Sequence, residues 1–312
     1  MAKLVIAGGT GDLGSAIIRY YYSKSDHEVV VLSRAPHSDT DRLRYVLWDG
    51  RSVGDWYHEL NAADVVINLA GEIINCRFTT LNRDRIRRSR IDATRAIGEA
   101  IQQVLVPPRL WINASGISIY EPSAVTLTES DEPRGTDFLA QVTRDWEEAF
   151  LVCHAPNTRK VCLRISSVLM TGRGMLKPLI RLVCFGLGGR IGSGDQYVSW
   201  IHEADFAQLV NWVIQRDDVY GVIHACSPNP VRNRDLMTAL RRALKQPFGV
   251  PNYTWATRFG SFLIGAEADL VLSGRRIVSR RLEAEGFVFT YPEINDAIRN
   301  LVNDRNTKSI KE

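Results

Sequence analysis

The sequence predicts an α/β protein built on a Rossmann-type, doubly wound parallel sheet, with a smaller, helix-rich region on its C-terminal side. The chain opens with a short apolar run, residues 4–7, that leads into a glycine turn and then into apolar residues at helical spacing. Strand-like runs then alternate with helical patterns over the first half, which is typical of a parallel sheet covered on both faces. With 312 residues, 45% of them hydrophobic, the chain can bury a core of this size.

The glycine turn contains Gly8, Gly11 and Gly14. In a dinucleotide-binding turn the first glycine adopts a backbone angle closed to other residues. The second lets the backbone approach a pyrophosphate, and the third lets the helix pack closely on the strand. The diphosphate would then lie on the free amides of the helix N-terminus. Because a strand precedes the turn and a helix follows it, we interpret it as a binding turn rather than a plain structural one.

The second predicted strand, residues 29–32, ends in Ser33 and Arg34. This position, about 20 residues past the glycine turn, meets the adenosine ribose. An acidic residue here would bind the ribose hydroxyls of NAD, whereas a hydroxyl and a guanidinium suit a 2′-phosphate. The sequence therefore favours NADP, with a simple surface charge as the alternative for Arg34.

Two further strands are predicted at residues 44–47 and 64–71. Asp49 follows the first of them and would either accept a hydrogen bond from the adenine amine or lie in a solvated loop. The second ends in small residues, which leave room for a ligand at the carboxyl edge of the sheet.

A basic run at residues 83–90 opens the next predicted helix, residues 86–104, which stops before two prolines. The run is either a solvated helix face or a site for an anionic phosphate. The formal net charge of +4 is mild, so a nucleic-acid partner is not expected.

The second half has a different texture. A glycine-rich loop at residues 186–194 is expected to fold over a site, and Asp205 is expected to cap a helix. The other elements expected after residue 104 are strands at 111–115, 161–165 and 221–225, and helices at 138–152, 205–213, 233–245, 259–272 and 291–302. We expect a dinucleotide-binding domain at 1–170, to which the 221–225 strand returns, a substrate-side region at 171–302, and a polar tail at 303–312.

The five cysteines are scattered and form no C-x-x-C pair, so we expect reduced thiols, no zinc site or other metal site, and a cytoplasmic location. No signal-peptide pattern is expected, and no apolar run is long enough to span a bilayer, so no membrane contact is expected. Helices flanking the sheet are compatible with a homodimer.

The chain resembles the short-chain dehydrogenase/reductase superfamily in its extended, epimerase-like branch. It is most similar to an atypical subgroup of NAD-dependent epimerase/dehydratase-like proteins, also called cell-division-inhibitor-like. The motifs that carry the resemblance are residues 8–14, 68–72, 89–94, 145–147 and 188–194, together with C-terminal stretches at 272–277 and 285–292.

The resemblance implies hydride transfer to or from a nicotinamide. The superfamily uses a Tyr-x-x-x-Lys pair, but the corresponding positions here are Leu139 and Thr143. Ser115 matches the superfamily serine, and Arg90 stands where an asparagine is usual, as in the atypical subgroup. The turn, the strand ends and the resemblance together place cofactor contacts at Gly8, Thr10, Gly11, Asp12, Leu13, Gly14, Ser33, Arg34, Asp49, Leu69, Ala70, Gly71, Arg85, Arg90 and Leu169.

The candidate catalytic residues are Ser115 and Tyr120. Tyr120 could supply a phenol whose pKa Arg90 lowers, or it could be a packing residue. Arg85 would join Arg90 at a phosphate if the helix faces inward. The first hypothesis is an NADP-dependent oxidoreductase acting on a small carbonyl or alcohol. The alternatives are a non-catalytic NADP(H)-binding sensor or partner-binding protein and, ranked lower, a sugar-nucleotide epimerase or dehydratase.

Overall fold

The computed structural model describes residues 2–24, 27–265 and 267–309. It contains a seven-stranded parallel sheet formed by β1 (Lys3–Ala7), β2 (Glu28–Ser33), β3 (Leu43–Leu47), β4 (Val65–Asn68), β5 (Leu110–Gly116), β7 (Arg159–Ile165) and β11 (Gly221–Ala225). The strand order is β11-β7-β5-β4-β1-β2-β3, so the chain reverses direction across the sheet at β1 and β4. This is the expected doubly wound arrangement, in which ligands bind beyond the carboxyl ends of the strands at the reversal.

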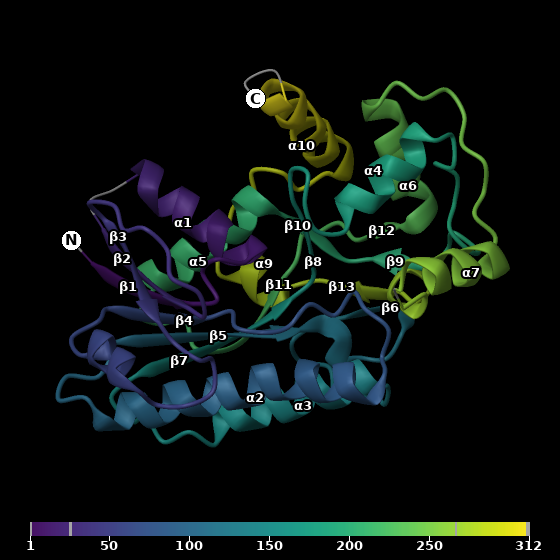
Figure 1. The fold of residues 1–312 in the computed structure, drawn as a ribbon. Coiled ribbons are helices and arrows are strands. Elements are labelled where there is room, and N and C mark those ends of the chain that lie inside the picture. Colours follow the sequence, from purple (N-terminus) through teal and green to yellow (C-terminus); the bar gives the residue numbers. More distant parts are fainter. Residues whose placement is uncertain (1, 25–26, 266, 310–312) are drawn as a thin grey trace.

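Helices cover both faces of this sheet (Figure 1). They and the remaining helices are α1 (Asp12–Lys24), α2 (Thr80–Gln103), α3 (Phe138–Leu151), α4 (Leu176–Cys184), α5 (Glu203–Gln215), α6 (Asn233–Ala243), α7 (Thr254–Ile264), α8 (Asp269–Leu272), α9 (Arg280–Ala284) and α10 (Ile294–Ser309), with 3-10 turns η1 (Asp55–Leu60) and η2 (Ile117–Ile119). Short strands outside the main sheet are β6 (Ser123–Leu127), β8 (Ser167–Leu169), β9 (Tyr197–Val198), β10 (Trp200–His202), β12 (Val231–Arg232) and β13 (Arg275–Ile277).

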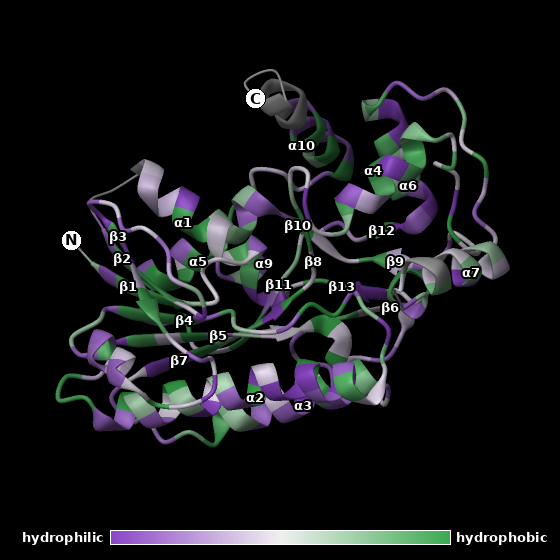
Figure 2. Ribbon diagram, viewed as in Figure 1, coloured by the Kyte–Doolittle hydropathy of each residue, from purple (hydrophilic) through white to green (hydrophobic). Residues whose placement is uncertain are grey.

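Alternation along the buried strands creates two cores. On β1, Leu4 and Ile6 pack against α1 and α5, while Val5 and Ala7 pack against α2 and η1 on the opposite face. Both sets are fully buried, because successive side chains of a strand point to opposite sides. The strands of the sheet are accordingly mostly apolar (Figure 2). The result is a rigid sheet whose carboxyl edge is available for a site.

A third cluster of buried residues joins α4, α6 and α10 around Trp200. In Figure 1 these helices lie beyond the carboxyl edge of the sheet, on the side away from α2 and α3. The glycine-rich loop belongs to this part: the Gly189 amide donates to the Val250 carbonyl, and the Gly192 amide donates to that of Asn252. The loop is therefore held against residues 250–252 and is not the expected lid; one of its residues, Ile191, reaches the cleft described below.

Several predicted helix limits are corrected. Helix α2 begins at Thr80, six residues before the expected start, because Thr79 caps it with its side chain. His202, not Asp205, caps α5, and the buried Asp205 carboxylate instead accepts the amides of Thr290 and Tyr291. The helix expected at 259–272 is two helices, separated at Gly265, whose φ is +72°. The expected polar tail continues α10 to Ser309.

Candidate functional site

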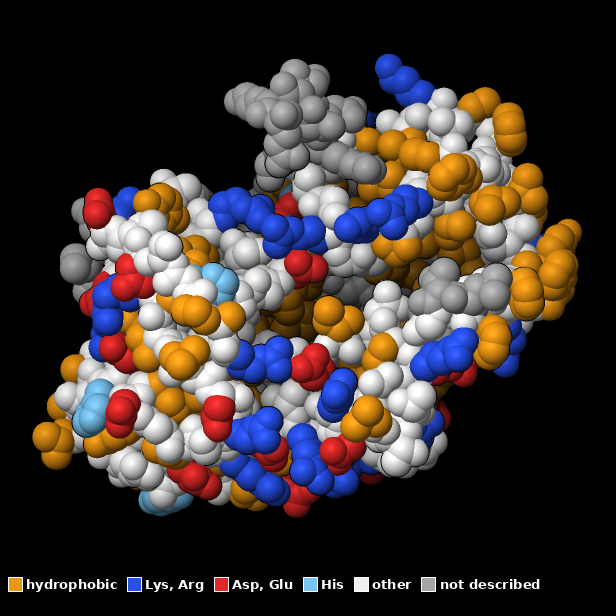
Figure 3. Space-filling model, in the orientation of Figure 1, with side chains coloured by type: hydrophobic (Ala, Val, Ile, Leu, Met, Phe, Trp, Pro, Cys, Tyr) orange, Lys and Arg blue, Asp and Glu red, His pale blue; other side chains and the backbone are white. Residues whose placement is uncertain are grey.

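A cleft of about 1010 Å³ lies between the carboxyl edge of the sheet and the α4–α6 part of the molecule. The glycine turn, the loop after β4, the end of β5, helix α3 and residues 267–275 all contribute to its walls. The molecule is hollowed between its two parts in the space-filling view (Figure 3). This is the position at which the strand order reverses, where an open α/β sheet binds its ligand.

The glycine turn forms one end of the cleft. Gly8 has a φ of +76°, and a Cβ atom there would lie 2.9 Å from the Ala70 nitrogen. A Cβ atom on Gly14 would lie 2.4 Å from the Cα of Gly9, so the close approach of helix to turn excludes any larger residue. The amides in the first turn of α1 have no acceptor within the helix and are available to a phosphate. Gly8, Gly11, Asp12, Leu13 and Gly14 line the cleft; Thr10 is exposed and lies outside that lining.

The loop after β4 supplies the neighbouring wall, with Leu69, Ala70, Gly71 and Glu72 lining the cleft. Arg90 on α2 lies behind this loop and also reaches the cleft. Its guanidinium donates to the carbonyl oxygens of Ile86 at 2.9 Å and Glu72 at 3.2 Å, and it stacks over the Trp146 ring. Burial lowers the pKa of Arg90 to about 10, and the Glu72 carboxylate acts in the opposite direction. A partly desolvated cation therefore lies beside the loop. An anion bound there would form a charge-assisted hydrogen bond with the Arg90 guanidinium and stabilise its charged form.

Ser33 and Arg34 lie at the end of β2, next to the glycine turn but outside the cleft lining. Arg34 Nη1 donates to Glu72 Oε1 at 2.9 Å, which ties the end of β2 to the loop after β4. The Ser33 hydroxyl oxygen accepts the Ala35 amide. Both residues are therefore positioned at the mouth of the cleft, where the adenosine end of a dinucleotide would lie.

Three more of the residues expected at the cofactor lie outside the cleft lining. Asp49 accepts the amides of Arg51 and Ser52 and the Ser52 hydroxyl, so it holds a turn outside the cleft lining. Burial acts to raise the pKa of Asp49, but these hydrogen bonds hold it below its usual value. Leu169 is fully buried in the core around α4, while its neighbours Val168 and Met170 line the cleft.

The third of these residues, Arg85, is exposed and lies outside the cleft lining. Arg83 lines it instead, and its guanidinium lies over the Phe138 ring. Arg83 and Arg90 are seven residues apart on α2, which puts them on one face, whereas a spacing of five does not. Helical spacing within the basic run therefore carried the signal that identifies Arg83.

Ser115, at the end of β5, lines the cleft, but its hydroxyl points away from the cleft. Ser115 Oγ donates to Glu147 Oε1 at 2.5 Å. Glu147 in turn forms a two-pronged ion pair with Arg164, with both N···O distances at 2.8 Å and both side chains buried. Burial alone would lower the pKa of Arg164, but the hydrogen bonds and charge of Glu147 raise it. With its proton committed to Glu147, Ser115 is held in place rather than free to donate to a ligand.

Tyr120 is removed from the candidate catalytic set by its surroundings. It is buried and lies outside the cleft lining. Its hydroxyl contacts Arg164 Nη1 at 2.6 Å, the Thr128 carbonyl at 3.1 Å and His224 Nε2 at 3.0 Å. Burial raises the pKa of Tyr120 to about 12, although Arg164 acts to lower it. The packing interpretation of Tyr120 is the one that this geometry supports.

A pair of hydroxyl groups, missed by the sequence reasoning, lies in the cleft wall. Thr143 occupies the position of the superfamily lysine and donates to the Leu139 carbonyl at 2.7 Å. Ser118 Oγ lies 2.9 Å from Thr143 Oγ1. Leu139, Ser118 and Thr143 all line the cleft. The sequence signal was available, because Ser118 follows β5 as closely as Tyr120 does.

Among residues 2–24, 27–265 and 267–309, no group of three or more His, Cys, Asp or Glu side chains is arranged to hold a metal ion. All five cysteines are free. In the same described residues, no helix has the length and hydropathy that crossing a membrane requires.

Comparison with known proteins places these features in a family. Residues 4–225 match the family model described as "NAD dependent epimerase/dehydratase family", and residues 255–301 match a "Domain of unknown function (DUF1731)". The chain is 32% identical over 305 residues to mouse "Epimerase family protein SDR39U1", covering 96% of this chain and 99% of the relative. It is also 32% identical to "Epimerase family protein YfhF" of Bacillus subtilis (strain 168), covering 98% and 99%.

A solved structure is similar over the same length. The crystal structure of human epimerase family protein SDR39U1 (isoform 2) with NADPH has a TM-score of 0.87 and 27% sequence identity. The match covers 97% of this chain and 99% of the human one.

Proposed function

This chain belongs to the NAD-dependent epimerase/dehydratase family, and from that premise we propose that it binds NADP(H) in the cleft and interconverts a small apolar carbonyl compound and its alcohol. The observation that carries the proposal is that the glycine turn and the Ser118–Thr143 hydroxyl pair line one continuous cleft. A dinucleotide held at the turn therefore extends toward the hydroxyl groups.

The cradle fits the cofactor. Gly8 and Gly14 leave a backbone surface that a Cβ atom would fill, and the first turn of α1 offers amides to the diphosphate. Arg34 at the mouth supports the phosphorylated form, since a guanidinium matches a 2′-phosphate. The related human structure contains NADPH, which supports the same choice here. When bound, NADPH supplies a hydride to a carbonyl carbon.

The chain's own contribution is to bind and polarise the substrate oxygen. Thr143 donates its proton to the Leu139 carbonyl, so Ser118 is the member of the pair whose proton can turn toward a substrate oxygen. A hydroxyl donor aimed at a developing alkoxide stabilises the charge that forms there. Ser115, held by Glu147, keeps the end of β5 in place beneath the pair.

An apolar substrate is supported by the far end of the cleft. The apolar side chains that line it there include Leu139, Val142, Leu179, Ile191 and Leu270.

The charged groups at this end oppose a diphosphate. Asp137, Glu267 and Asp269 line the cleft and outnumber the cations near them, Arg83 and Arg275. Arg275 is already engaged by Asp137 at 3.1 Å and by the Tyr120 carbonyl. A sugar nucleotide would bring its diphosphate to carboxylates, which ranks that alternative lower.

A steady-state assay of NADPH oxidation across a panel of apolar aldehydes and ketones tests the proposal. We expect Ser118→Ala to lower kcat about a hundredfold, as removal of an oxyanion donor does, with NADPH affinity retained. Ser23→Ala, which removes a hydroxyl on α1, is the control and should match the parent. An unchanged kcat in Ser118→Ala would overturn the catalytic assignment.

A non-catalytic NADP(H)-binding protein is the second candidate, because Leu139 and Thr143 replace the superfamily's proton-transfer pair. This alternative predicts NADPH binding without turnover of any panel member. A measurable hydride-transfer rate that falls in Thr143→Val, but not in Thr238→Val, eliminates it. Thr238 is a matched control, since it donates to the carbonyl four residues before it on α6, as Thr143 does on α3.

A further inference from the structure

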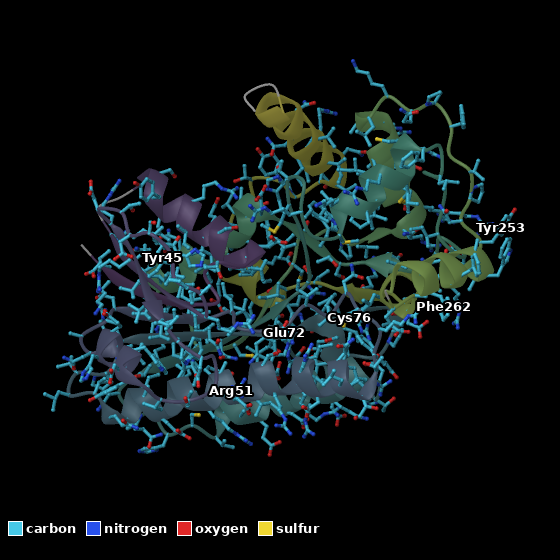
Figure 4. The ribbon with its side chains drawn as sticks, in the orientation of Figure 1. Tyr45, Arg51, Glu72, Cys76, Tyr253 and Phe262 are labelled. Atoms are coloured by element: carbon cyan, nitrogen blue, oxygen red, sulfur yellow. The ribbon has the colours of Figure 1, made fainter. Side chains whose placement is uncertain are left out.

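Six large aromatic side chains are exposed on the part of the molecule that contains α4 and α7, and one of them, Phe262, also lies against the Arg77 guanidinium. They are between 54% and 81% exposed, and we call them the aromatic ridge: Phe185, Phe248, Tyr253, Trp255, Phe259 and Phe262. Apolar side chains gather along this edge of the molecule in Figure 3, over α4 and α7. Tyr253 and Phe262 mark the two ends of α7 in Figure 4. An exposed apolar surface of this kind marks an interaction site.

Helix α7 is amphipathic, but its large apolar side chains lie on the exposed face instead of the buried one. Trp255, Phe259 and Phe262, at positions i, i+4 and i+7, form one exposed face. Small residues such as Ala256 and Gly260 lie on the less exposed face. A surface helix normally buries its large apolar residues, so a helix that presents them to solvent is arranged to dock on something else.

The rest of the ridge continues from α7 onto α4. Residues 250–253 lead directly into α7, and the Val250 amide donates to the Gly186 carbonyl. That bond holds the segment carrying Phe248 beside the end of α4, where Phe185 lies. The aromatic side chains therefore come from neighbouring segments and form one surface.

Positive charge predominates on this surface. The two segments that carry the ridge, residues 176–190 and 236–262, contain seven Lys or Arg residues and no Asp or Glu. Arg181 lies one helical turn before Phe185, Arg190 lies over the Tyr253 ring, and Arg258 precedes Phe259. Asp269 is the carboxylate paired with one of these cations, Arg258, at 3.5 Å. Exposed aromatic residues with an excess of cations around them match a lipid surface, whose headgroups are anionic and whose interior is apolar.

We propose that the aromatic ridge docks this protein on an anionic lipid surface, with α7 lying in the plane of the headgroups. Trp, Tyr and Phe side chains favour that depth, and the surrounding Lys and Arg side chains reach lipid phosphates. This is peripheral contact, and it requires no membrane-spanning helix. It also replaces the expectation, drawn from the lack of a spanning apolar run, that the protein makes no membrane contact.

A second copy of the chain is a poorer occupant. A two-fold interface brings the same patch of each copy together, so the excess cations of one ridge would face those of the other. The two segments contain no carboxylate to compensate them. An anionic partner is therefore needed, and the aliphatic and aromatic character of the ridge favours lipid over a polar acidic protein.

Co-sedimentation of the full chain with vesicles tests the proposal. We expect binding to vesicles of phosphatidylcholine mixed with phosphatidylserine, weak binding to phosphatidylcholine alone, and a decline as salt is raised. Trp255→Ser combined with Phe259→Ser should reduce binding at least tenfold. Arg181→Glu should reduce it about fivefold or more, as loss of one interfacial cation does.

The controls lie on the other part of the molecule, beyond the C-terminal end of α2. Leu105→Ser and Arg109→Glu change an exposed apolar side chain and an exposed cation there, and should bind vesicles as the parent does. No preference for phosphatidylserine vesicles, or equal losses in these controls, would overturn the proposal. So would a lipid-free dimer, detected by sedimentation velocity, that the Trp255→Ser/Phe259→Ser variant turns into a monomer. NADPH binding is measured separately, so a failure of the cofactor proposal is distinguishable from a failure of this one.

Discussion

Arg34 Nη1 lies 2.9 Å from Glu72 Oε1, and this ion pair joins the end of β2 to the loop after β4 across the mouth of the cleft. Arg34 is the residue proposed to bind the 2′-phosphate of NADP. Glu72, labelled near the centre of Figure 4, is therefore a competitor for the same guanidinium. The Glu72 carboxylate and the 2′-phosphate cannot both bind the same N–H groups of Arg34. The Arg34–Glu72 ion pair therefore limits how much more tightly the protein binds NADP than NAD.

We expect Glu72→Gln to tighten NADP binding several-fold, because the competing carboxylate and its repulsion of the 2′-phosphate are both removed. Arg34→Ala should weaken NADP binding by about tenfold to a hundredfold and leave NAD binding nearly unchanged. Calorimetric titration of both cofactors measures these changes. Glu148→Gln, on the exposed side of α3, is the matched control. A parent protein that binds both cofactors equally would contradict the role given to Arg34.

The two arginines of the basic run should behave differently. Arg83→Met removes a cation that lines the cleft, so it should weaken the binding of NADPH or of a substrate. Arg85→Met removes an exposed cation two residues away, so it should leave both affinities unchanged. Titrating NADPH into both variants shows which face of α2 contributes to binding. Equal losses of affinity in the two variants would show that the effect comes from net charge.

The buried pair of Glu147 and Arg164 should be the most sensitive polar site for stability. Arg164→Leu leaves a buried carboxylate without its partner and should cost about 3–5 kcal/mol of unfolding free energy. Arg134→Leu breaks an exposed ion pair with Glu132 and should cost less than about 1 kcal/mol. Urea unfolding of both variants measures the difference. Similar urea midpoints for Arg164→Leu and Arg134→Leu would mean that the buried ion pair contributes no more to stability than the exposed one.

His224 should make the protein less stable in acid. Its Nδ1 lies 2.9 Å from the Val278 carbonyl and carries the hydrogen, which leaves Nε2 as an acceptor 3.0 Å from the Tyr120 hydroxyl, whose one proton also faces the Thr128 carbonyl. Burial lowers the pKa of His224, so the unfolded chain binds a proton that the folded one rejects. Stability is then full above the unfolded pKa, about 6.5, and falls as the pH drops below it.

The comparison with His224→Gln isolates this contribution. Chemical unfolding between about pH 7 and pH 5 should show a steeper loss for the parent than for His224→Gln, which cannot take up the proton. The variant should be less stable than the parent at neutral pH because the contact with Tyr120 changes. Parallel pH profiles for the two proteins would contradict the buried neutral state of His224.

Most of the parallel sheet could be predicted from the sequence, because buried strands such as β1 and β4 are short, continuous apolar runs with small residues at their ends. The elements around the cleft could not. Strands β8 to β10 are only two or three residues long, and their pairing depends on contacts distant in sequence. Helix α7 begins at Thr254 and ends before Gly265, whereas the sequence predicted one helix over 259–272, because the turn at Gly265 leaves the apolar spacing unbroken.

The cofactor end of the site could be predicted because it depends on local backbone. The catalytic end could not, because it depends on contacts between residues distant in sequence. The glycine turn performs its role through the local backbone, so Gly8 and Gly14 could be identified one by one. Ser115 and Tyr120 lie at or just after the carboxyl end of β5, which borders the cleft. Their hydroxyl groups, however, bind Glu147 and Arg164 in a buried hydrogen-bond network. That network joins residues from β5, α3 and β7, and no local pattern reveals which hydroxyl faces the ligand.

Isothermal titration of NADPH and NADH into the purified chain tests the central claim most directly. We expect saturable binding of NADPH that is tighter than that of NADH. Binding should be lost in Gly14→Ala, whose Cβ would meet the Gly9 backbone, and kept in Gly260→Ala, where nothing lies within 4 Å. Absence of any binding heat with NADPH, confirmed by an unchanged melting temperature in its presence, would contradict it.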